Sequence, residues 1–279
     1  MNSIPFTKLH GCGNDFIAID NREQAFSISD LIAQTPAMCN RKLGIGADGL
    51  LVLNPPVEPN TDFEMIYRNA DGSDAGMCGN GGRCIAQFAN SLGMGKNFRF
   101  SVHKGLYSTI VNPTEVQLSW EGLKVSVRKK HLAQEIITLF QLFTGTDHVV
   151  LLDQDLSNSA ALLQVGAAIR YNKALNSKGT NVNFIAKSSE NGLSKSTLNV
   201  ITYERGVEDL TLACGTGALA SAIAWHFAHK STQLLNTTMI KMPGGKLLCE
   251  FRFNLETKEY DNLCLSGAAI TVYNGVYYA

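Results

Sequence analysis

Short apolar stretches separated by glycine- and asparagine-rich turns run along most of this chain, and two longer apolar segments stand out between them. Alternating or β-rich stretches predict strands at 16–20, 50–53, 63–67, 98–102, 107–111, 116–120, 149–152, 182–186, 198–203, 247–253 and 270–273. Helices are predicted over 28–40 and 157–170, from Cys78 to about Gly93, and from Cys214 to about His229. Because the turns are short and rich in glycine, we expect an α/β fold whose sheet is mostly antiparallel.

The order of these features repeats at an interval close to half the chain length. Tyr67 lies 11 residues before Cys78, and Tyr203 lies 11 residues before Cys214. The intervals between matching positions are 132 residues for Gly13 and Gly145, 135 for Gly44 and Gly179, and 136 for the two cysteines. A repeat of this length predicts two related domains rather than the short-period stacking of a solenoid.

The length of 279 residues suits two domains better than a single hydrophobic core. We expect the first domain over residues 1–122 and 265–279 and the second over 123–264, with the chain changing domain near Gly122. In this division the last strand returns to the first domain, and each domain contains one of the two repeated cysteines.

Each of these cysteines opens a glycine-rich start to an apolar helix. Residues 78–83 read CGNGGR and residues 214–218 read CGTGA. The first turn of a helix leaves backbone N–H groups free and has a partial positive charge, so it lowers the pKa of a thiol and binds carboxylates. A thiol beside an anion-binding turn is half of an active site, and its duplication predicts one site made from two matching halves.

Two facing thiols can invert the α-carbon of an amino acid. One thiolate removes the α-proton from one face while the other thiol donates a proton to the opposite face. Each sulfur should then lie about 3–3.5 Å from the α-carbon, and the helix amides would stabilise the enolate-like carboxylate. This chemistry needs no cofactor.

Charge and composition narrow the possible functions. Lys and Arg total 24 and Asp and Glu total 24, so no basic field is available to hold nucleic acid or an anionic membrane. The N-terminus lacks the pattern of a secretory signal, and no apolar run is long enough to span a bilayer. The odd number of cysteines, seven, favours reduced thiols in the cytoplasm. Cys39, Cys249 and Cys264 lack partners at metal-ligand spacing, so we expect no metal.

An ordered set of motifs along most of the chain resembles the diaminopimelate epimerase family, which comprises pyridoxal-phosphate-independent enzymes of lysine and peptidoglycan biosynthesis. The matching segments are 10–16 (HGCGNDF), 44–49 (GIGADG), 69–73 (NADGS), 77–84 (MCGNGGRC), 181–184 (NVNF), 203–206 (YERG), 213–217 (ACGTG) and 243–245 (PGG). The resemblance implies epimerisation of LL-diaminopimelate to the meso form. It also implies a homodimer that acts on a small amino acid and uses no cofactor or metal.

The resemblance further implies a fold of two pseudo-symmetric domains, each a mostly antiparallel sheet curled around a central helix. The active site would lie in the cleft between them. Cys78 and Cys214 would be the acid/base pair, and His148 and Glu204 would tune their pKa values. The residues implied to bind the substrate are Asn14, Asn69, Gly79, Asn80, Asn183, Glu204, Arg205, Gly215 and Thr216.

One segment departs from the family pattern, and it bears on the substrate. The family usually has Gly-x-Pro-His, often with Asn at x, where this chain has Thr146 and Asp147 before His148. Thr146 is a shorter hydrogen-bond donor, and Asp147 replaces a rigid proline with a negative charge. Cys12 in the first motif is also unusual, and we interpret it as a small buried residue rather than a third catalytic thiol.

Several alternatives remain open from the sequence. The same fold could act on another amino acid such as glutamate or proline, although Glu204 and Arg205 favour a substrate that is polar at both ends. A more distant alternative is a thiol redox or metal-binding protein. Arg83 would either line the cleft or form a salt bridge, and residues 128–130 (RKK) would form a solvated turn. The sequence does not show which cysteine is the thiolate at rest, although the resemblance suggests Cys214 as acceptor and Cys78 as donor for one isomer.

Overall fold

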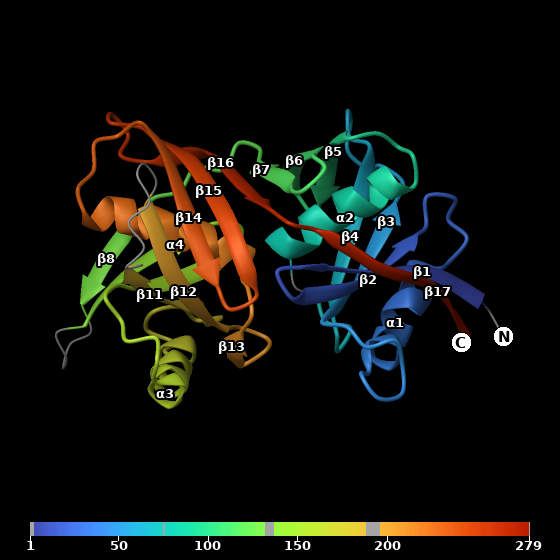
Figure 1. Ribbon diagram of the computed structural model, residues 1–279, viewed down its shortest axis with the longest axis horizontal. Coiled ribbons are helices and arrows are strands. Elements are labelled where there is room, and N and C mark those ends of the chain that lie inside the picture. Colours follow the sequence, from blue (N-terminus) through green and yellow to red (C-terminus); the bar gives the residue numbers. More distant parts are fainter. Residues whose placement is uncertain (1–2, 75, 132–136, 188–195, 279) are drawn as a thin grey trace. The chain divides into compact units, whose positions relative to one another are not determined.

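The computed structural model describes residues 3–74, 76–131, 137–187 and 196–278, and the chain divides into two compact units (Figure 1). Unit 1 consists of residues 1–121 and 266–279, and unit 2 consists of residues 122–265. Each boundary lies one residue from the position expected from the sequence. We describe the two units separately.

Unit 1 contains eight strands in one sheet and two helices within the described residues. Their bounds are β1 (Ser3–Gly11), β2 (Asn14–Asp20), α1 (Ile28–Cys39), β3 (Gly49–Asn54), β4 (Phe63–Asn69), α2 (Gly79–Ser91), β5 (Asn97–Val102), β6 (Gly105–Val111), β7 (Val116–Trp120) and β17 (Ile270–Tyr278). The strands pair in the order β17-β1-β2-β3-β4-β5-β6-β7. The pairs β2–β3 and β4–β5 are parallel and the others are antiparallel.

Unit 2 repeats this arrangement. Its elements are β8 (Arg128–His131), β9 (Thr138–Phe143), β10 (Asp147–Leu151), α3 (Ser159–Arg170), β11 (Asn181–Lys187), β12 (Ser196–Glu204), β13 (Asp209–Thr211), α4 (Gly215–Ala228), β14 (Leu235–Met242), β15 (Gly245–Phe253) and β16 (Tyr260–Gly267). The pairing order is β8-β9-β10-β11-β12-β14-β15, with β13 added to β12. The parallel pairs, β10–β11 and β12–β14, are the counterparts of those in unit 1.

The helices of each unit differ in how much of their surface is apolar, and this difference sets their positions. In α4 every residue from Gly215 to Ala224 is buried, so the helix needs cover on all sides and packs against β9, β10, β11, β12, β14 and β15. Helix α2 is enclosed by strands of unit 1 in the same way. In α1 and α3 only one face is buried, and they cover the outside of their sheets.

These features confirm the expected fold class, an α/β fold with a mostly antiparallel sheet curled around a central helix. Each strand and helix predicted from the sequence is present, and α1 continues through Pro36. One interpretation was wrong: residues 128–130 form most of strand β8 rather than a turn, because they pair with Leu139, Phe140 and Gln141 of β9. Strands β1, β9, β13, β14 and β16 were also not predicted.

Candidate functional site

Cys78 is the residue immediately before α2, and its extended backbone (φ −112°, ψ 118°) turns the chain into the helix. Its sulfur accepts a hydrogen bond from the Gly81 N–H at 3.3 Å, so the thiol itself caps the first turn. The space beside position 81 is narrow, because an added Cβ would lie 3.1 Å from the Leu51 side chain and 3.4 Å from the Cys78 Cβ. The glycine-rich sequence therefore lets the sulfur fold back onto the helix N-terminus.

A chain of side-chain amides connects Cys78 to the interior of unit 1. The Asn14 Nδ2 donates to Asp48 at 2.8 Å, so its Oδ1 faces the helix, where it accepts from Asn80 Nδ2 at 3.2 Å. The Cys78 sulfur lies 3.6 Å from the same Oδ1. Asn80 is held in this orientation because its own Oδ1 accepts from Arg83 at 2.8 Å. Asn14 and Asn80, both predicted site residues, thus lie together at the start of α2.

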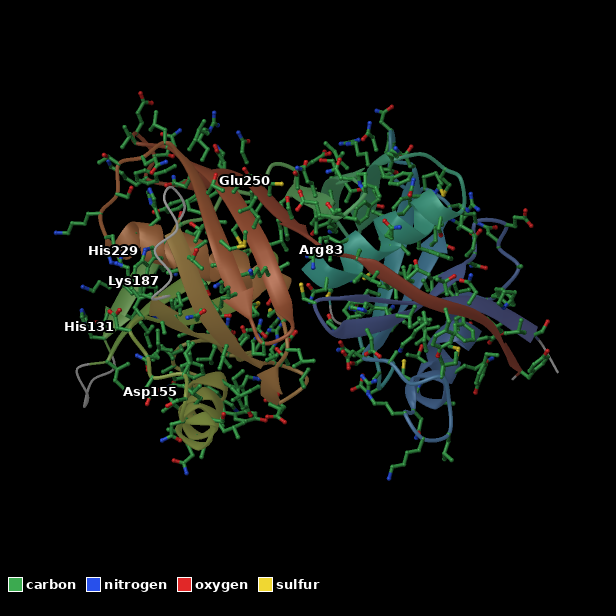
Figure 2. All side chains as sticks on the ribbon, in the orientation of Figure 1. Arg83, His131, Asp155, Lys187, His229 and Glu250 are labelled. Atoms are coloured by element: carbon green, nitrogen blue, oxygen red, sulfur yellow. The ribbon has the colours of Figure 1, made fainter. Side chains whose placement is uncertain are left out.

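Arg83 lies on the first turns of α2 (Figure 2). Its side chain is fully buried. Its guanidinium donates to Gly79 O at 3.1 Å and to Asn80 Oδ1, while its Nε has no hydrogen-bond partner within the described residues. Arg83 does not line a cleft, because its side chain is fully buried, and the hydrogen bonds described for its guanidinium go to a backbone carbonyl and a side-chain amide rather than to a carboxylate. A cation is therefore buried beside the first turn that follows Cys78.

Cys12 is 6% exposed, as expected for a small buried residue. Burial raises the pKa of its thiol, although the nearby charge and hydrogen bond of Arg83 act in the opposite direction. A thiol held protonated by burial is a poor nucleophile, which agrees with a packing role for Cys12.

Charged side chains secure the turn that precedes Asn14 and the strand that follows it. Asp15 accepts two hydrogen bonds from Arg41, at 2.7 and 3.0 Å, and forms an ion pair with Lys8 at 2.7 Å. Burial alone would raise the pKa of Asp15, but the hydrogen bonds and charges of Arg41 and Lys8 lower it to about 2. Arg41 also contacts Asp48, which orients Asn14.

In unit 2, Cys214 occupies the equivalent position before α4, again with an extended backbone (φ −125°, ψ 108°). It is 6% exposed, and its sulfur lies 3.6 Å from the Thr216 hydroxyl. Gly215 and Thr216 begin the helix and are both buried. Glycine is required at position 217, because an added Cβ would overlap the Asn183 side-chain oxygen and contact Cys214.

His148 is fully buried between the sheet and the start of α4. Its Nε2 lies 3.0 Å from the Thr216 hydroxyl, and its Nδ1 lies 3.0 Å from Asn183 Nδ2. Burial lowers the pKa of His148 to about 3, and the positive charge of Arg205 acts in the same direction. The imidazole is therefore neutral near neutral pH. The structure thus brings the predicted residues Cys214, Thr216 and His148 together.

Asn183 was predicted to contact the substrate, and the structure places its side chain in the interior of unit 2, with 0% exposed. Its Nδ2 also donates to Val149 O at 3.0 Å, and its Oδ1 accepts from the Thr202 hydroxyl at 2.9 Å. Contact with substrate stays a prediction for this residue. The observed hydrogen bonds connect it to His148.

Asn181 was not singled out from the sequence, although it belongs to the same NVNF motif. Its Nδ2 donates to the Thr146 hydroxyl at 2.8 Å and to Asp147 O, and its Oδ1 accepts from the Arg205 N–H at 2.9 Å. Asn181 therefore connects Arg205 to residues 146–147, the segment that differs from the usual family pattern. Side chains alternate between the two faces of a strand, so Asn181 and Asn183 lie on the same face of β11. The sequence does not show which way that face points, and therefore gave no signal for Asn181.

The remaining predicted residues lie at strand ends. Asn69 ends β4, where it accepts from the Tyr67 hydroxyl at 3.1 Å and donates to Ser73. Glu204 ends β12 and is half-buried, as is Arg205, whose guanidinium donates to Gly179 O at 3.3 Å. Asp147 lines a cavity of about 400 Å³ in unit 2, together with Lys124 and Arg128.

Each unit thus presents a cysteine sulfur at the N-terminus of a buried helix, surrounded by hydrogen-bonding side chains that fix its environment. Free amides at such a terminus suit a carboxylate, and a thiol is a group that can give up or accept a proton. Within the described residues, no group of three or more His, Cys, Asp or Glu side chains could hold a metal ion. No helix in the described part of the chain is long and apolar enough to span a membrane.

Known proteins resemble this chain along most of its length. The model of the family described as diaminopimelate epimerase matches residues 6–120 and 140–262. A diaminopimelate epimerase of Flavobacterium psychrophilum is 39% identical over 269 residues, which cover 95% of this chain and 97% of that protein. The one from Chlorobaculum tepidum is 38% identical over 278 residues, covering 96% and 98%.

Among solved structures, a phenazine biosynthesis protein of the PhzF family from Bacillus anthracis matches with a TM-score of 0.78 over 100% of both chains. The sequences are only 10% identical, so this match shows a shared fold and says nothing about the reaction.

Proposed function

Because the chain belongs to the diaminopimelate epimerase family, we propose that it interconverts LL- and meso-diaminopimelate by moving a proton between Cys78 and Cys214 without a cofactor. The observation that supports this reaction best is the duplicated half-site, in which each unit has a cysteine directly before the first turn of its central helix. Inversion of a carbon centre is the same reaction in both directions, so it suits a site with two equivalent proton-transfer groups.

In the proposed mechanism, one thiolate removes the α-proton and the other thiol protonates the opposite face of the same carbon. The backbone amides of Gly79, Asn80, Gly215 and Thr216 bind the α-carboxylate as it gains enolate character. Asn14 contacts polar groups of the substrate beside Cys78. His148 and Glu204 tune the pKa of the thiols.

The distal amino-acid end of the substrate is assigned to Asn69, Glu204 and Arg205. A guanidinium can bind a carboxylate through two hydrogen bonds, and Asn and Glu side chains suit an ammonium group. Both half-sites must meet one substrate, with each sulfur about 3–3.5 Å from the α-carbon. Closure over the substrate would exclude water during proton transfer.

The reaction can be tested by incubating the protein with LL-diaminopimelate in deuterium oxide. We expect deuterium to enter the α-position together with formation of the meso isomer. The double variant Cys78→Ala, Cys214→Ala should neither exchange the hydrogen nor invert the carbon. Exchange and turnover that persist in this variant would remove the proposed mechanism.

The substrate is tested separately with a panel of diaminopimelate, glutamate and proline. We expect turnover of diaminopimelate, because Glu204 and Arg205 favour a substrate with a second polar end. Restoring the family residue in Thr146→Asn should change KM by about fivefold, the size expected for one hydrogen bond, with little change in kcat. A preference for glutamate or proline would contradict diaminopimelate as the substrate and would leave the proposed proton-transfer mechanism intact.

We further propose that the protein is a homodimer joined through β17. This strand has nine residues without a single charge, and Val272, Tyr273 and Val276 are 54%, 45% and 46% exposed. Its counterpart β8 has only four residues, three of them Arg or Lys. Charged, short edge strands resist pairing with other chains, whereas a long apolar edge invites it.

The dimer is tested by sedimentation of the variant Val272→Lys, Val276→Lys, which should be monomeric. The control Ile110→Lys replaces a residue of β6 that is 47% exposed, and this variant should remain dimeric. A wild-type protein that sediments as a monomer at micromolar concentration would contradict the proposal.

Finally, we propose a cytoplasmic location, since the reaction needs reduced thiols and the cytoplasm maintains them. Oxidation of the purified protein with diamide should abolish epimerisation, and added reductant should restore it. Activity that is indifferent to oxidation would argue against catalytic thiols.

A further inference from the structure

The side chains behind Cys214 form a continuous hydrogen-bonded series that ends at the catalytic sulfur. It runs from Thr202 through Asn183 and His148 to Thr216, with separations of 2.9, 3.0 and 3.0 Å, and then to Cys214 at 3.6 Å. Thr202, Asn183, His148 and Thr216 are each no more than 3% exposed. Water is therefore largely excluded as an alternative partner, and the protons within the series are set by the protein.

Two contacts fix the orientation of the Asn183 amide. Its Nδ2 lies 3.0 Å from the Val149 carbonyl, which can only accept a hydrogen bond, so this atom must be the nitrogen. The Oδ1 then faces the Thr202 hydroxyl, which donates to it. The second hydrogen of Nδ2 remains for His148 Nδ1.

This orientation determines the tautomer of His148. A ring nitrogen that accepts from Asn183 has no proton of its own, so the single proton of the neutral imidazole is on Nε2. The Nε2–H then donates to the Thr216 hydroxyl oxygen. Since that oxygen accepts from His148, its own hydrogen is left to donate to another atom, and the Cys214 sulfur lies 3.6 Å away.

We infer that Asn183 is a positioning residue, which holds His148 as the Nε2–H tautomer and thereby turns the Thr216 hydroxyl hydrogen toward the sulfur of Cys214. A hydroxyl that donates to sulfur stabilises thiolate over thiol. The series therefore poises Cys214 to accept a proton. The inference rests on the proposed function only in treating Cys214 as a catalytic thiol.

Two further features of unit 2 support this role for Asn183. Gly217 provides the space in which the Asn183 oxygen approaches the helix, since any side chain there would overlap it. His148 stays neutral because of its burial, which lowers its pKa to about 3 and leaves one ring proton to be placed. The imidazole therefore keeps a single ring proton at any pH well above this value.

The tautomer can be measured directly in the full-length protein labelled with ¹⁵N-histidine. Long-range ¹H–¹⁵N spectra distinguish protonated from unprotonated ring nitrogens, and the variant His148→Gln identifies the signals. We expect Nε2 to be protonated and Nδ1 unprotonated in the wild type. The opposite pattern, or a mixture of both forms, would overturn the inference even if the protein epimerises its substrate as proposed.

The consequence for the sulfur is measured without substrate, by the rate at which iodoacetamide alkylates Cys214, with Cys78 as the internal reference. Thr216→Val should slow alkylation of Cys214 by roughly tenfold, the effect of losing one hydrogen bond to a charged group. Thr216→Ser should retain most of the wild-type rate. Equal rates in the Val and Ser variants would contradict the role of the hydroxyl.

Asn183→Leu removes the donor to His148 and introduces the residue that unit 1 has at the equivalent position, Leu51. We expect the Nδ1-protonated form to become populated and alkylation of Cys214 to slow, while that of Cys78 is unchanged. An unaltered His148 spectrum in this variant would refute the assignment. The wild-type spectrum and the variants Thr216→Val and Thr216→Ser test the inference independently of Asn183→Leu. The inference can therefore still be refuted if Asn183→Leu does not fold.

Discussion

The half-sites of units 1 and 2 have the same backbone but surround their sulfur atoms with different side chains. In the parallel pairs β2–β3 and β10–β11, Phe16 pairs with Gly49 and His148 with Asn181, so equivalent positions are 132 residues apart. Phe16 of unit 1 is therefore the counterpart of His148. Leu51 is likewise the counterpart of Asn183, and each lies against the second glycine of its helix start.

The side chains closest to the two sulfur atoms differ in their hydrogen-bonding character. Cys78 lies 3.6 Å from Asn14 Oδ1, a carbonyl oxygen whose orientation is fixed from both sides and which can only accept. Cys214 faces the Thr216 hydroxyl, which can donate. The two cysteines thus occupy equivalent backbone positions, and the side chains beside them differ.

The largest expected effect tests whether both half-sites are needed. Cys78→Ala and Cys214→Ala should each lower kcat by about 10²–10⁴-fold, the range typical of a lost general acid or base. The losses should be similar despite the different surroundings, because inversion requires both proton transfers. Cys264 lies outside both half-sites, so the control variant Cys264→Ala should retain activity. The kcat values of the three variants are compared by steady-state kinetics with both isomers as substrate. Full activity in either single variant would show that one half-site suffices.

The buried arginine of unit 1 provides a second test. Arg83→Met should lower the free energy of unfolding by about 3 kcal/mol, because Gly79 O and Asn80 Oδ1 lose their donors inside the protein. It should also lower activity, since Asn80 and Asn14 lose their fixed orientation.

The matched control for Arg83→Met lies 136 residues further along the chain. Leu219→Met changes the equivalent position of α4 and should cost less than about 1.5 kcal/mol, as a volume-conserving core change does. Urea denaturation of both variants measures the difference. Equal losses would mean that the buried cation has no special role in unit 1.

The sequence predicted the duplicated plan, the helices and most strands, because these depend on local periodicity and on turns. It missed β1 because Lys8 interrupts the apolar pattern, and only the fold shows that this lysine is buried in an ion pair with Asp15. It interpreted residues 128–130 as a turn, since pairing with β9 is a long-range property that charge alone does not reveal.

The candidate site shows the same limit. Motifs identified both cysteines and His148, but they gave no means to separate Asn181 from Asn183, which lie two residues apart in one strand. Which of the two faces His148 depends on the register of β10 and β11. Arg83 was misinterpreted for a related reason: an arginine is rarely fully buried, and its burial follows from the sheet that encloses α2.

The glycines that follow the cysteines test the difference in packing between the half-sites. Gly217→Ala should destabilise the protein by about 1.5 kcal/mol, because the new methyl group overlaps Asn183, whose position is fixed by Val149 and Thr202. Gly81→Ala should be nearly neutral, since its methyl group would lie 3.1 Å from the flexible end of Leu51 and alanine favours the helix. Thermal or urea unfolding measures the stability of both variants. A larger loss of stability in Gly81→Ala than in Gly217→Ala would contradict the proposed difference in packing between the half-sites.

The smallest expected effect is a pH dependence of stability that belongs to unit 2. The pKa of His148 is about 3 in the folded protein and 6.5 for the ordinary side chain, so between these values the unfolded chain binds a proton that the folded chain does not. Stability should therefore fall as the pH decreases, by about 1 kcal/mol from about pH 7.5 to about pH 5.5. Asp15, whose pKa is lowered to about 2, adds a similar loss only below its ordinary value of 3.8. His148→Gln should remove most of the change in stability between about pH 7.5 and about pH 5.5 and leave the change below pH 3.8 unaltered. Urea denaturation at a series of pH values measures both changes. If stability in this variant still falls equally between about pH 7.5 and about pH 5.5, His148 is not the group responsible.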